Sequence, residues 1–194
     1  MAEITNRPRP WNGAVANVLF LDLDGVLNSV NWMSNVNPDF WIAEDGDTQL
    51  DPEAVMRLER VVRESGAKIV LSSSWRKLYE YKTIESFLRH HGFTGEVIGE
   101  TPHRVDFAER PAGTYQRGWE IQAWLDEHPE VAHFAILDDD SDMAHLTDHF
   151  VHTKHPHGLQ DEHIPQILKL LGTTILEGRD EQEAATRADQ ARGT

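Results

Sequence analysis

The stretch from Val18 to Asn28, Val-Leu-Phe-Leu-Asp-Leu-Asp-Gly-Val-Leu-Asn, constrains the fold of this chain more than any other. Its first four residues are apolar, which is typical of a strand that is buried on both faces of a parallel sheet. Because side chains alternate along a strand, Asp22 and Asp24 leave it on the same side. Gly25 then permits a sharp turn that brings the backbone close to a ligand.

The two carboxylates of Asp22 and Asp24 repel each other. At about 4 Å and an effective dielectric constant near 20, this repulsion is roughly 4 kcal/mol. Such a pair persists when a divalent cation neutralises it, when one group is protonated, or when the strand ends in solvent. The first two states indicate a functional site, whereas the third is a strand followed by an ordinary Asp-Gly turn. The stretch by itself leaves these alternatives open.

Composition limits the classes of protein to which the chain can belong. The 194 residues suffice for one α/β domain with a substantial core. The net charge of -15 argues against an extended nucleic-acid footprint and against an anionic membrane surface. A nucleic-acid end held by a few arginines remains compatible with it. The chain has no cysteine, which excludes disulfides and thiolate metal sites. Without a signal-like segment or an apolar run long enough for a bilayer, the sequence predicts a cytoplasmic protein with no membrane contact.

The chain divides into three parts by its local character. We expect residues 1–16 to form an extended lead-in, because Pro8 and Pro10 oppose regular structure. Residues 17–172 form the single packed domain, in which 25–50 is a flap or small insertion. Residues 173–194 form a charged tail.

Strand and helix signals alternate through the packed part. We expect helices over 52–65, around 84–90, over 115–127 and over 161–171, and further strands at 67–71, 96–99, 133–137 and 150–153. The first of these helices has the clearest ends, with Asp51 as N-cap, Pro52 in the first turn and Gly66 after the last. This order predicts a Rossmann-like three-layer α/β sandwich with a central parallel sheet.

Small hydroxyl side chains follow the predicted strand 67–71. Ser72, Ser73 and Ser74 lie where a helix begins, and hydroxyls beside a helix N-terminus suit a phosphoryl oxygen. The alternative is an ordinary Ser N-cap. Arg76 lies just beyond them and is either a reader of a phosphodiester or a solvated first-turn arginine.

A second acidic cluster follows the predicted strand 133–137. Asp138, Asp139, Asp140 and Asp142 put four carboxylates within five residues, and hard oxygen ligands favour Mg²⁺. The alternative is an Asx-type turn that caps a helix continuing through Ala144 and Leu146.

Arg117 lies in the first turn of the predicted helix 115–127, where the helix dipole disfavours a cation. Its position indicates an anionic neighbour, or else an exposed arginine without a role.

His145 and His149 have the i, i+4 spacing of a zinc site on a helix, but a predicted strand follows them. The sequence therefore favours a polar, partly exposed loop at these histidines.

Taken in this order, the motifs resemble the haloacid dehalogenase (HAD) superfamily of phosphohydrolases. The first motif, Asp-x-Asp-Gly, is matched by residues 22–25; the second by Ser73 or Ser72; the third by Arg117; and the fourth by Asp138 and Asp139, with Asp142 as a further candidate. The resemblance covers residues 17–171. The Ser-Ser-Trp-Arg and Arg-Gly-Trp-Glu-Ile segments are similar to those of small members grouped with RNA-repair-associated domains.

The resemblance implies an Mg²⁺-dependent phosphohydrolase that acts through an aspartyl-phosphate. Asp22 would be the nucleophile and Asp24 the general acid and base. Asp22, the Asp24 backbone and Asp138 or Asp139 would hold Mg²⁺, while Ser73 and Arg117 would hold the phosphate oxygens. The intervals between motifs leave room for only a minimal cap, so an open site would suit a polynucleotide end, a phosphoprotein or a nucleotide. The rival hypothesis is a catalytically silent module that keeps the fold and the metal-binding residues.

Overall fold

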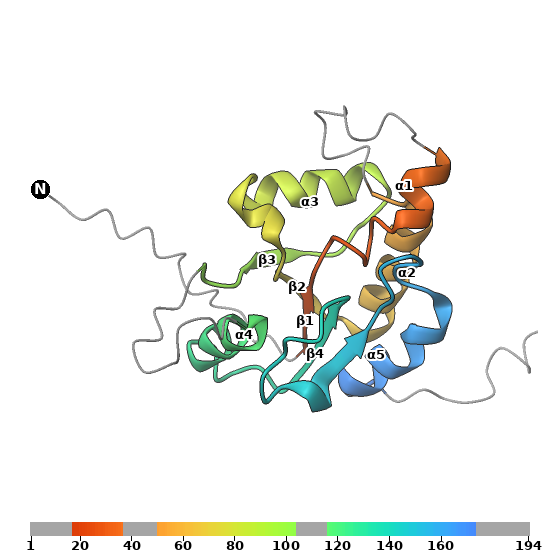
Figure 1. Cartoon of the computed structure of the whole chain (residues 1–194). Helices are drawn as coiled ribbons and strands as arrows, with labels where there is room; N and C mark the ends of the chain where they lie inside the picture. Colours follow the sequence, from red (N-terminus) through yellow and green to blue (C-terminus); the bar gives the residue numbers. More distant parts are fainter. Residues whose placement is uncertain (1–16, 37–49, 104–115, 174–194) are drawn as a thin grey trace, which may run out of the picture.

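The computed structural model describes residues 17–36, 50–103 and 116–173 (Figure 1). Five strands form one sheet in the order β3-β2-β1-β4-β5, and every neighbouring pair is parallel. The strands are β1 (Asn17–Leu21), β2 (Lys68–Leu71), β3 (Val97–Glu100), β4 (His133–Asp138) and β5 (Phe150–His152). The predicted Rossmann-like α/β fold is confirmed.

β1 lies at the centre of the sheet, and its register aligns the ends of its neighbours. Leu21, its last residue, pairs with Leu71 of β2 and with Leu137 of β4. One more hydrogen bond continues each ladder, since Asp22 N–H donates to the Leu137 carbonyl at 3.0 Å and Ser72 N–H donates to the Leu21 carbonyl at 2.8 Å. The chain order reverses between β1 and β4, and in open parallel sheets ligands bind at such a point.

Helices cover both faces of the sheet (Figure 1). Leu19 and Leu21 of β1 belong to the core on one face, with apolar residues of α2 (Pro52–Ser65), α3 (Tyr81–His90) and α5 (Ile164–Leu170). Val18 and Phe20 point to the other face, where α4 (Arg117–Asp126) packs. This alternation is what a strand buried on both sides requires.

The ends of α2 are those that the sequence predicts. The Asp51 carboxylate accepts a hydrogen bond from Glu53 N–H at 2.9 Å, and Pro52 occupies the first helical position. After the last turn, Gly66 takes a left-handed conformation with φ of 67°, and its N–H donates to the Val62 carbonyl. Glycine adopts this conformation without a steric cost, and it ends the helix cleanly.

The chain after β4 differs from the prediction. No helix runs through Ala144 and Leu146, because Ala144 has a φ of 51° and the Leu146 N–H closes a turn on the Met143 carbonyl. The next element in the chain is the short 3-10 helix η4 (Thr147–His149). The expectation of a continuing helix is therefore wrong, and His145 and His149 do not share a helical face.

The remaining differences concern short elements. A 3-10 helix, η3 (Ser74–Lys77), follows the serines, and α3 begins only at Tyr81. The predicted flap contains the helix α1 (Val30–Val36), which the sequence did not indicate. A further 3-10 helix, η5 (Asp161–His163), leads into α5.

The other predicted segments lie largely outside the described residues: the lead-in over 1–16, residues 37–49 of the flap, most of the loop after β3, and nearly all of the tail. Within the described part, none of the helices has the length and apolar character that crossing a membrane requires.

Candidate active site

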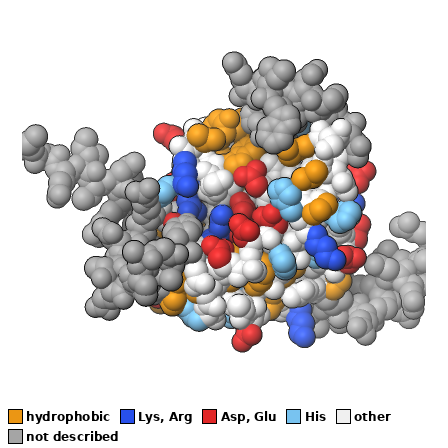
Figure 2. All heavy atoms as spheres, in the orientation of Figure 1, with side chains coloured by type: hydrophobic (Ala, Val, Ile, Leu, Met, Phe, Trp, Pro, Cys, Tyr) orange, Lys and Arg blue, Asp and Glu red, His pale blue; other side chains and the backbone are white. Residues whose placement is uncertain are grey.

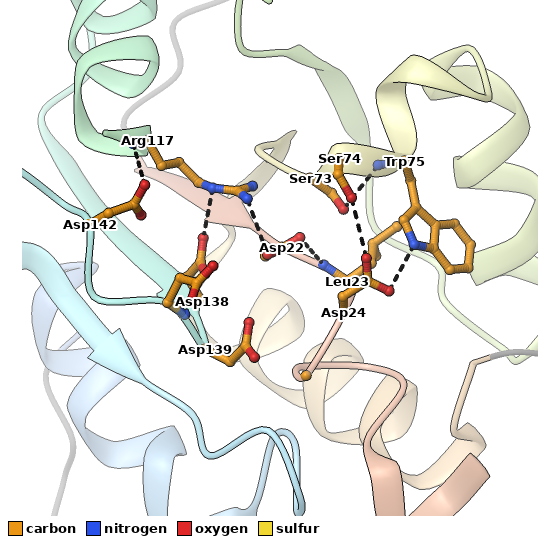
Figure 3. A network of polar contacts seen from close by, with 12 residues as sticks. Asp22, Leu23, Asp24, Ser73, Ser74, Trp75, Arg117, Asp138, Asp139 and Asp142 are labelled. Carbon is orange, nitrogen blue, oxygen red and sulfur yellow. Dashed lines mark hydrogen bonds and ion pairs between the residues drawn. The ribbon is translucent and has the colours of Figure 1, made fainter. Parts of the chain in front are cut away.

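Acidic side chains gather near the middle of the face shown in Figure 2, with Lys, Arg and His side chains around them. They come from the carboxyl ends of the central strands. Asp22 and Asp24 follow β1, Ser72 to Ser74 follow β2, and Asp138 ends β4. The first turn of α4 adds Arg117 (Figure 3).

Asp22, Asp138 and Asp139 form the centre of the site. One carboxylate oxygen of each residue lies within 4.8 Å of the other two. Asp22 and Asp138 are buried, and they are more than 100 residues apart in the chain. The parallel pairing of β1 with β4 brings them together, as the strand-end motifs predicted.

Burial raises the pKa of both central carboxyls. For Asp138, burial and the neighbouring Asp22 carboxylate raise the pKa to about 8, while Arg117 opposes this shift. For Asp22, burial raises the pKa, and Arg117 and a hydrogen bond from the Ser73 side chain oppose it. The described residues therefore under-compensate the two anionic forms.

Arg117 is the cation beside these carboxylates. Its Nη2 lies 3.6 Å from Asp22 Oδ2, and its Nε lies 3.3 Å from Asp138 Oδ2 (Figure 3). These contacts account for a positive side chain at a helix N-terminus, as its position in the sequence indicated. The backbone N–H of Arg117 donates to Asp142 Oδ2 at 2.9 Å, so the Asp142 side chain caps the start of α4. Asp142 is not one of the three carboxylates whose oxygens lie close together.

Gly118 lets α4 approach the acidic loop closely. A Cβ atom at this position would lie 2.1 Å from the Met143 carbonyl oxygen, which is backbone and cannot move aside cheaply. The Gly118 N–H donates to the Asp142 carbonyl at 3.2 Å. The glycine therefore helps to hold the start of α4, and Arg117 with it, against the loop after β4.

The donor set fits a hard divalent cation. All three grouped ligand atoms are carboxylate oxygens, the type that Mg²⁺ prefers. Asp138 Oδ2 is buried, and within the described residues no hydrogen bond reaches it, although Arg117 Nε lies nearby. In the described part of the chain, one guanidinium faces two buried carboxylates, so a cation here would remove a charge imbalance that these residues leave in place.

Asp24 points to a different side of the site (Figure 3). Its Oδ1 accepts hydrogen bonds from Trp75 Nε1 at 2.9 Å and from Asn28 Nδ2 at 2.8 Å. Its Oδ2 accepts one from Ser74 Oγ at 3.3 Å. Sequence reasoning missed Trp75 and Asn28; the only signal for them was their closeness to the second and first motifs.

The serines after β2 make different contacts. The Ser73 hydroxyl donates a hydrogen bond to the Asp22 carboxylate. As the N-cap of η3, Ser73 Oγ also accepts a hydrogen bond from the Trp75 backbone N–H at 3.4 Å. Both interpretations of the sequence, a phosphate ligand and a cap, therefore fit Ser73. The Ser72 hydroxyl is buried and has no hydrogen-bond partner within the described residues.

Arg76 is neither solvated nor part of the carboxylate cluster. Its side chain is only 3 % exposed and forms an ion pair with Glu120 of α4. It also donates to the Thr101 hydroxyl after β3. The position ties the loop after β2 to α4, which disfavours the expected contact with a substrate phosphodiester.

Gly25 and His155 surround Asp139. Gly25 has a φ of 65°, and a Cβ atom there would lie 2.2 Å from Asp139 Oδ2. His155 Nδ1 lies 2.8 Å from the same oxygen, and His152 Nε2 lies 2.8 Å from the Asp139 carbonyl. The group of close ligand atoms found in the described part of the chain contains carboxylates only, so it does not support a zinc site built from the histidines.

The comparison with protein families decides the family. The model described as "HAD domain in Swiss Army Knife RNA repair proteins" matches residues 18–164, which include every element from β1 to the start of α5. The chain belongs to this family. Comparisons with curated proteins and with solved structures gave no match.

The HAD family assignment agrees with the geometry of the site. At the level of the superfamily, it identifies a phosphohydrolase-type domain, and HAD proteins generally use Mg²⁺. The three grouped carboxylates supply oxygen ligands of the kind that this ion takes.

Proposed function

We propose that this HAD domain hydrolyses phosphomonoesters in an Mg²⁺-dependent reaction through an aspartyl-phosphate on Asp22. The observation that carries the proposal is the grouping of Asp22 with Asp138 and Asp139, whose oxygens lie within 4.8 Å, beside the Arg117 guanidinium. A nucleophile, a cation site and a positive side chain thus lie together at the carboxyl ends of the central strands.

Asp22 is the group that attacks phosphorus. Its Oδ1 accepts the Leu23 N–H at 2.7 Å, which fixes the carboxylate, and Oδ2 faces Arg117. Attack forms an Asp22 oxygen–phosphorus bond and breaks the bond from phosphorus to the leaving oxygen. Arg117 and Ser73 are placed to stabilise the negative charge of the phosphoryl oxygens.

Asp22, Asp138 and Asp139, with the Asp24 backbone carbonyl, would hold Mg²⁺, which would neutralise charge and orient the phosphate. Asp24 gives its carboxylic proton to the leaving oxygen. In the second step it takes a proton from the water that attacks phosphorus, which breaks the Asp22–phosphate bond and releases inorganic phosphate. The products are an alcohol and phosphate, and both carboxyls return to their starting states.

The substrate that we propose is a phosphorylated polynucleotide end or a nucleotide. The family description names RNA repair proteins, and the resemblance to members with a minimal cap implies an open site. A net charge of -15 limits any contact with nucleic acid to the neighbourhood of the site. The cytoplasmic location stays a prediction from the sequence.

The test is hydrolysis of p-nitrophenyl phosphate by the purified chain, with Mg²⁺ and with EDTA. We expect turnover that requires Mg²⁺ and that Asp22→Asn lowers by at least about 1,000-fold, because the nucleophile is lost. Asp148→Asn is the matched control, since it removes an exposed carboxylate on η4. Equal turnover by Asp22→Asn and wild type would remove the assignment of the nucleophile.

A panel of substrates then separates the two hypotheses. It contains oligonucleotides with 3′- and 5′-phosphates, nucleotides and sugar phosphates. Turnover of one class identifies the substrate class. Mg²⁺ binding without turnover of any member would contradict the enzyme and support the silent metal-binding module.

A further inference from the structure

The two oxygens of the Asp24 carboxylate have different partners. Oδ1 accepts from Trp75 Nε1 at 2.9 Å and from Asn28 Nδ2 at 2.8 Å. Oδ2 accepts from the Ser74 hydroxyl at 3.3 Å, and Ser74 is exposed. Two short bonds therefore hold one oxygen, and one longer bond reaches the other.

The donors to Oδ1 are themselves held in place. Asn28 Oδ1 accepts the Gly25 N–H at 3.0 Å, which defines the end of the amide that faces Asp24. Trp75 is buried, and its ring packs at a tilt against Tyr79. Its backbone N–H donates a hydrogen bond to the Ser73 hydroxyl. One donor comes from the loop after β1 and the other from the loop after β2, so the pair spans two loops of the site.

The chemistry of these donors determines where Asp24 can carry a proton. An indole N–H and an amide NH₂ donate and cannot accept, so a proton on Oδ1 would face two donors. A hydroxyl both donates and accepts, so the Ser74 hydroxyl can rotate when Oδ2 is protonated. Only Oδ2 can carry the proton without losing a hydrogen bond.

We infer that Trp75 and Asn28 are positioning residues that hold Asp24 with Oδ2 as its proton-transferring atom, which adapts the site to alcohol leaving groups. The inference rests on the proposed phosphatase function. In the first step the proton moves from Asp24 Oδ2 to the leaving oxygen as its bond to phosphorus breaks and the Asp22–phosphorus bond forms. In the second step Oδ2 accepts a proton from the attacking water, and phosphate leaves Asp22.

The leaving group gives a test that a loss of folding cannot imitate. A nitrophenolate leaves readily without protonation, whereas a benzyl alkoxide needs an acid. Trp75→Phe removes the Nε1–H donor and retains an aromatic ring. We expect it to lower kcat/KM for benzyl phosphate by about 10- to 100-fold, while kcat/KM for p-nitrophenyl phosphate changes by less than about threefold. The ratio kcat/KM is the readout because it includes only the steps up to the aspartyl-phosphate, whereas kcat also includes its hydrolysis, which both esters share.

Two further variants calibrate this result. Trp124→Phe is the matched control, because Trp124 is a buried tryptophan of α4 that packs on Phe20 on the opposite face of the sheet. It should change kcat/KM for both substrates by the same factor. Asn28→Ala removes the second donor and should repeat the selective loss on benzyl phosphate, which keeps the test valid if Trp75→Phe does not fold.

The outcomes separate this inference from the proposed function. Equal losses in kcat/KM on the two esters, or no loss on either, in folded Trp75→Phe and Asn28→Ala would overturn the positioning role. Absence of Mg²⁺-dependent hydrolysis in the wild type would instead overturn the phosphatase on which the inference rests.

Discussion

Two buried carboxylates of this domain, Glu85 and Asp138, differ in how far neighbouring groups compensate their negative charge. Glu85 on α3 is 7 % exposed, and its oxygens accept hydrogen bonds from Lys82 and Arg89 at 2.8 Å and from Val97 N–H at 3.4 Å. Burial raises its pKa, but these bonds outweigh burial and lower it. Asp138 is fully buried, and burial with the nearby Asp22 raises its pKa to about 8.

The two pKa values shift in opposite directions because the charged side chains around Glu85 and Asp138 differ. Lys82 and Arg89 stand three residues before and four residues after Glu85 on the same helix, so the charge is balanced locally. Asp138 meets other carboxylates and shares one guanidinium with Asp22. A charge imbalance of this kind costs folding stability, and such costs are typical of sites that function requires.

The largest expected effect comes from Asp138→Asn. It should lower kcat/KM for p-nitrophenyl phosphate by at least about 100-fold, because a ligand of the proposed cation is lost. In EDTA the variant should unfold at a higher temperature than the wild type, because a buried and poorly compensated charge disappears. Kinetics and thermal unfolding of the same preparation check both statements. Full activity, or a lower melting temperature in EDTA, would place Asp138 with the structural carboxylates.

Mg²⁺ should have the next largest effect. At a tenfold excess over its dissociation constant, binding to the folded state alone adds about 1.4 kcal/mol to the free energy of unfolding. We expect the melting temperature to rise in the wild type and in Glu85→Gln, and to remain unchanged in Asp138→Asn. Thermal unfolding across a series of Mg²⁺ concentrations measures this. A shift in Asp138→Asn equal to that of the wild type would show that the ion binds elsewhere.

Glu85→Gln tests the other half of the comparison. The side chains of Lys82 and Arg89 are half exposed, so solvent screens the pairs and the loss of unfolding free energy should be about 1 kcal/mol. The kcat and KM values should stay at those of the wild type, because α3 contributes no group to the site. Urea unfolding provides the measurement, and a matching fall in kcat would contradict the separation of the two regions.

The smallest expected effect is the pH dependence of this difference. The folded pKa of Glu85 lies below its ordinary value of 4.5, so its stabilisation is present above that pH and is lost as the pH falls through the folded pKa. The gap in unfolding free energy between wild type and Glu85→Gln should therefore be constant near neutrality and narrow in acid. Urea unfolding over a range of about pH 3 to 7 would reveal it. A gap that widens in acid would show that the pKa of Glu85 is raised on folding.

Residues that act through their neighbours in the chain were predictable from the sequence. The run from Val18 to Leu21 indicated the central strand, and Asp51, Pro52 and Gly66 marked the ends of α2, since a cap needs only the few residues around it. The alternation of strands and helices indicated a parallel sheet. Because parallel strands end at one edge, the meeting of Asp22 with Asp138 and Asp139 followed from the order of elements.

Contacts between loops were decided only by the tertiary structure. The burial of Arg76 against Glu120, the two donors that face Asp24 Oδ1 and the turn that replaces a helix at Ala144 all depend on how segments far apart in the chain pack. Helical spacing and caps carry no information on such distances, because they describe a few residues at a time. The sequence by itself therefore determined the strand edge at which the chemistry lies, and the packed loops determined which atoms face one another there.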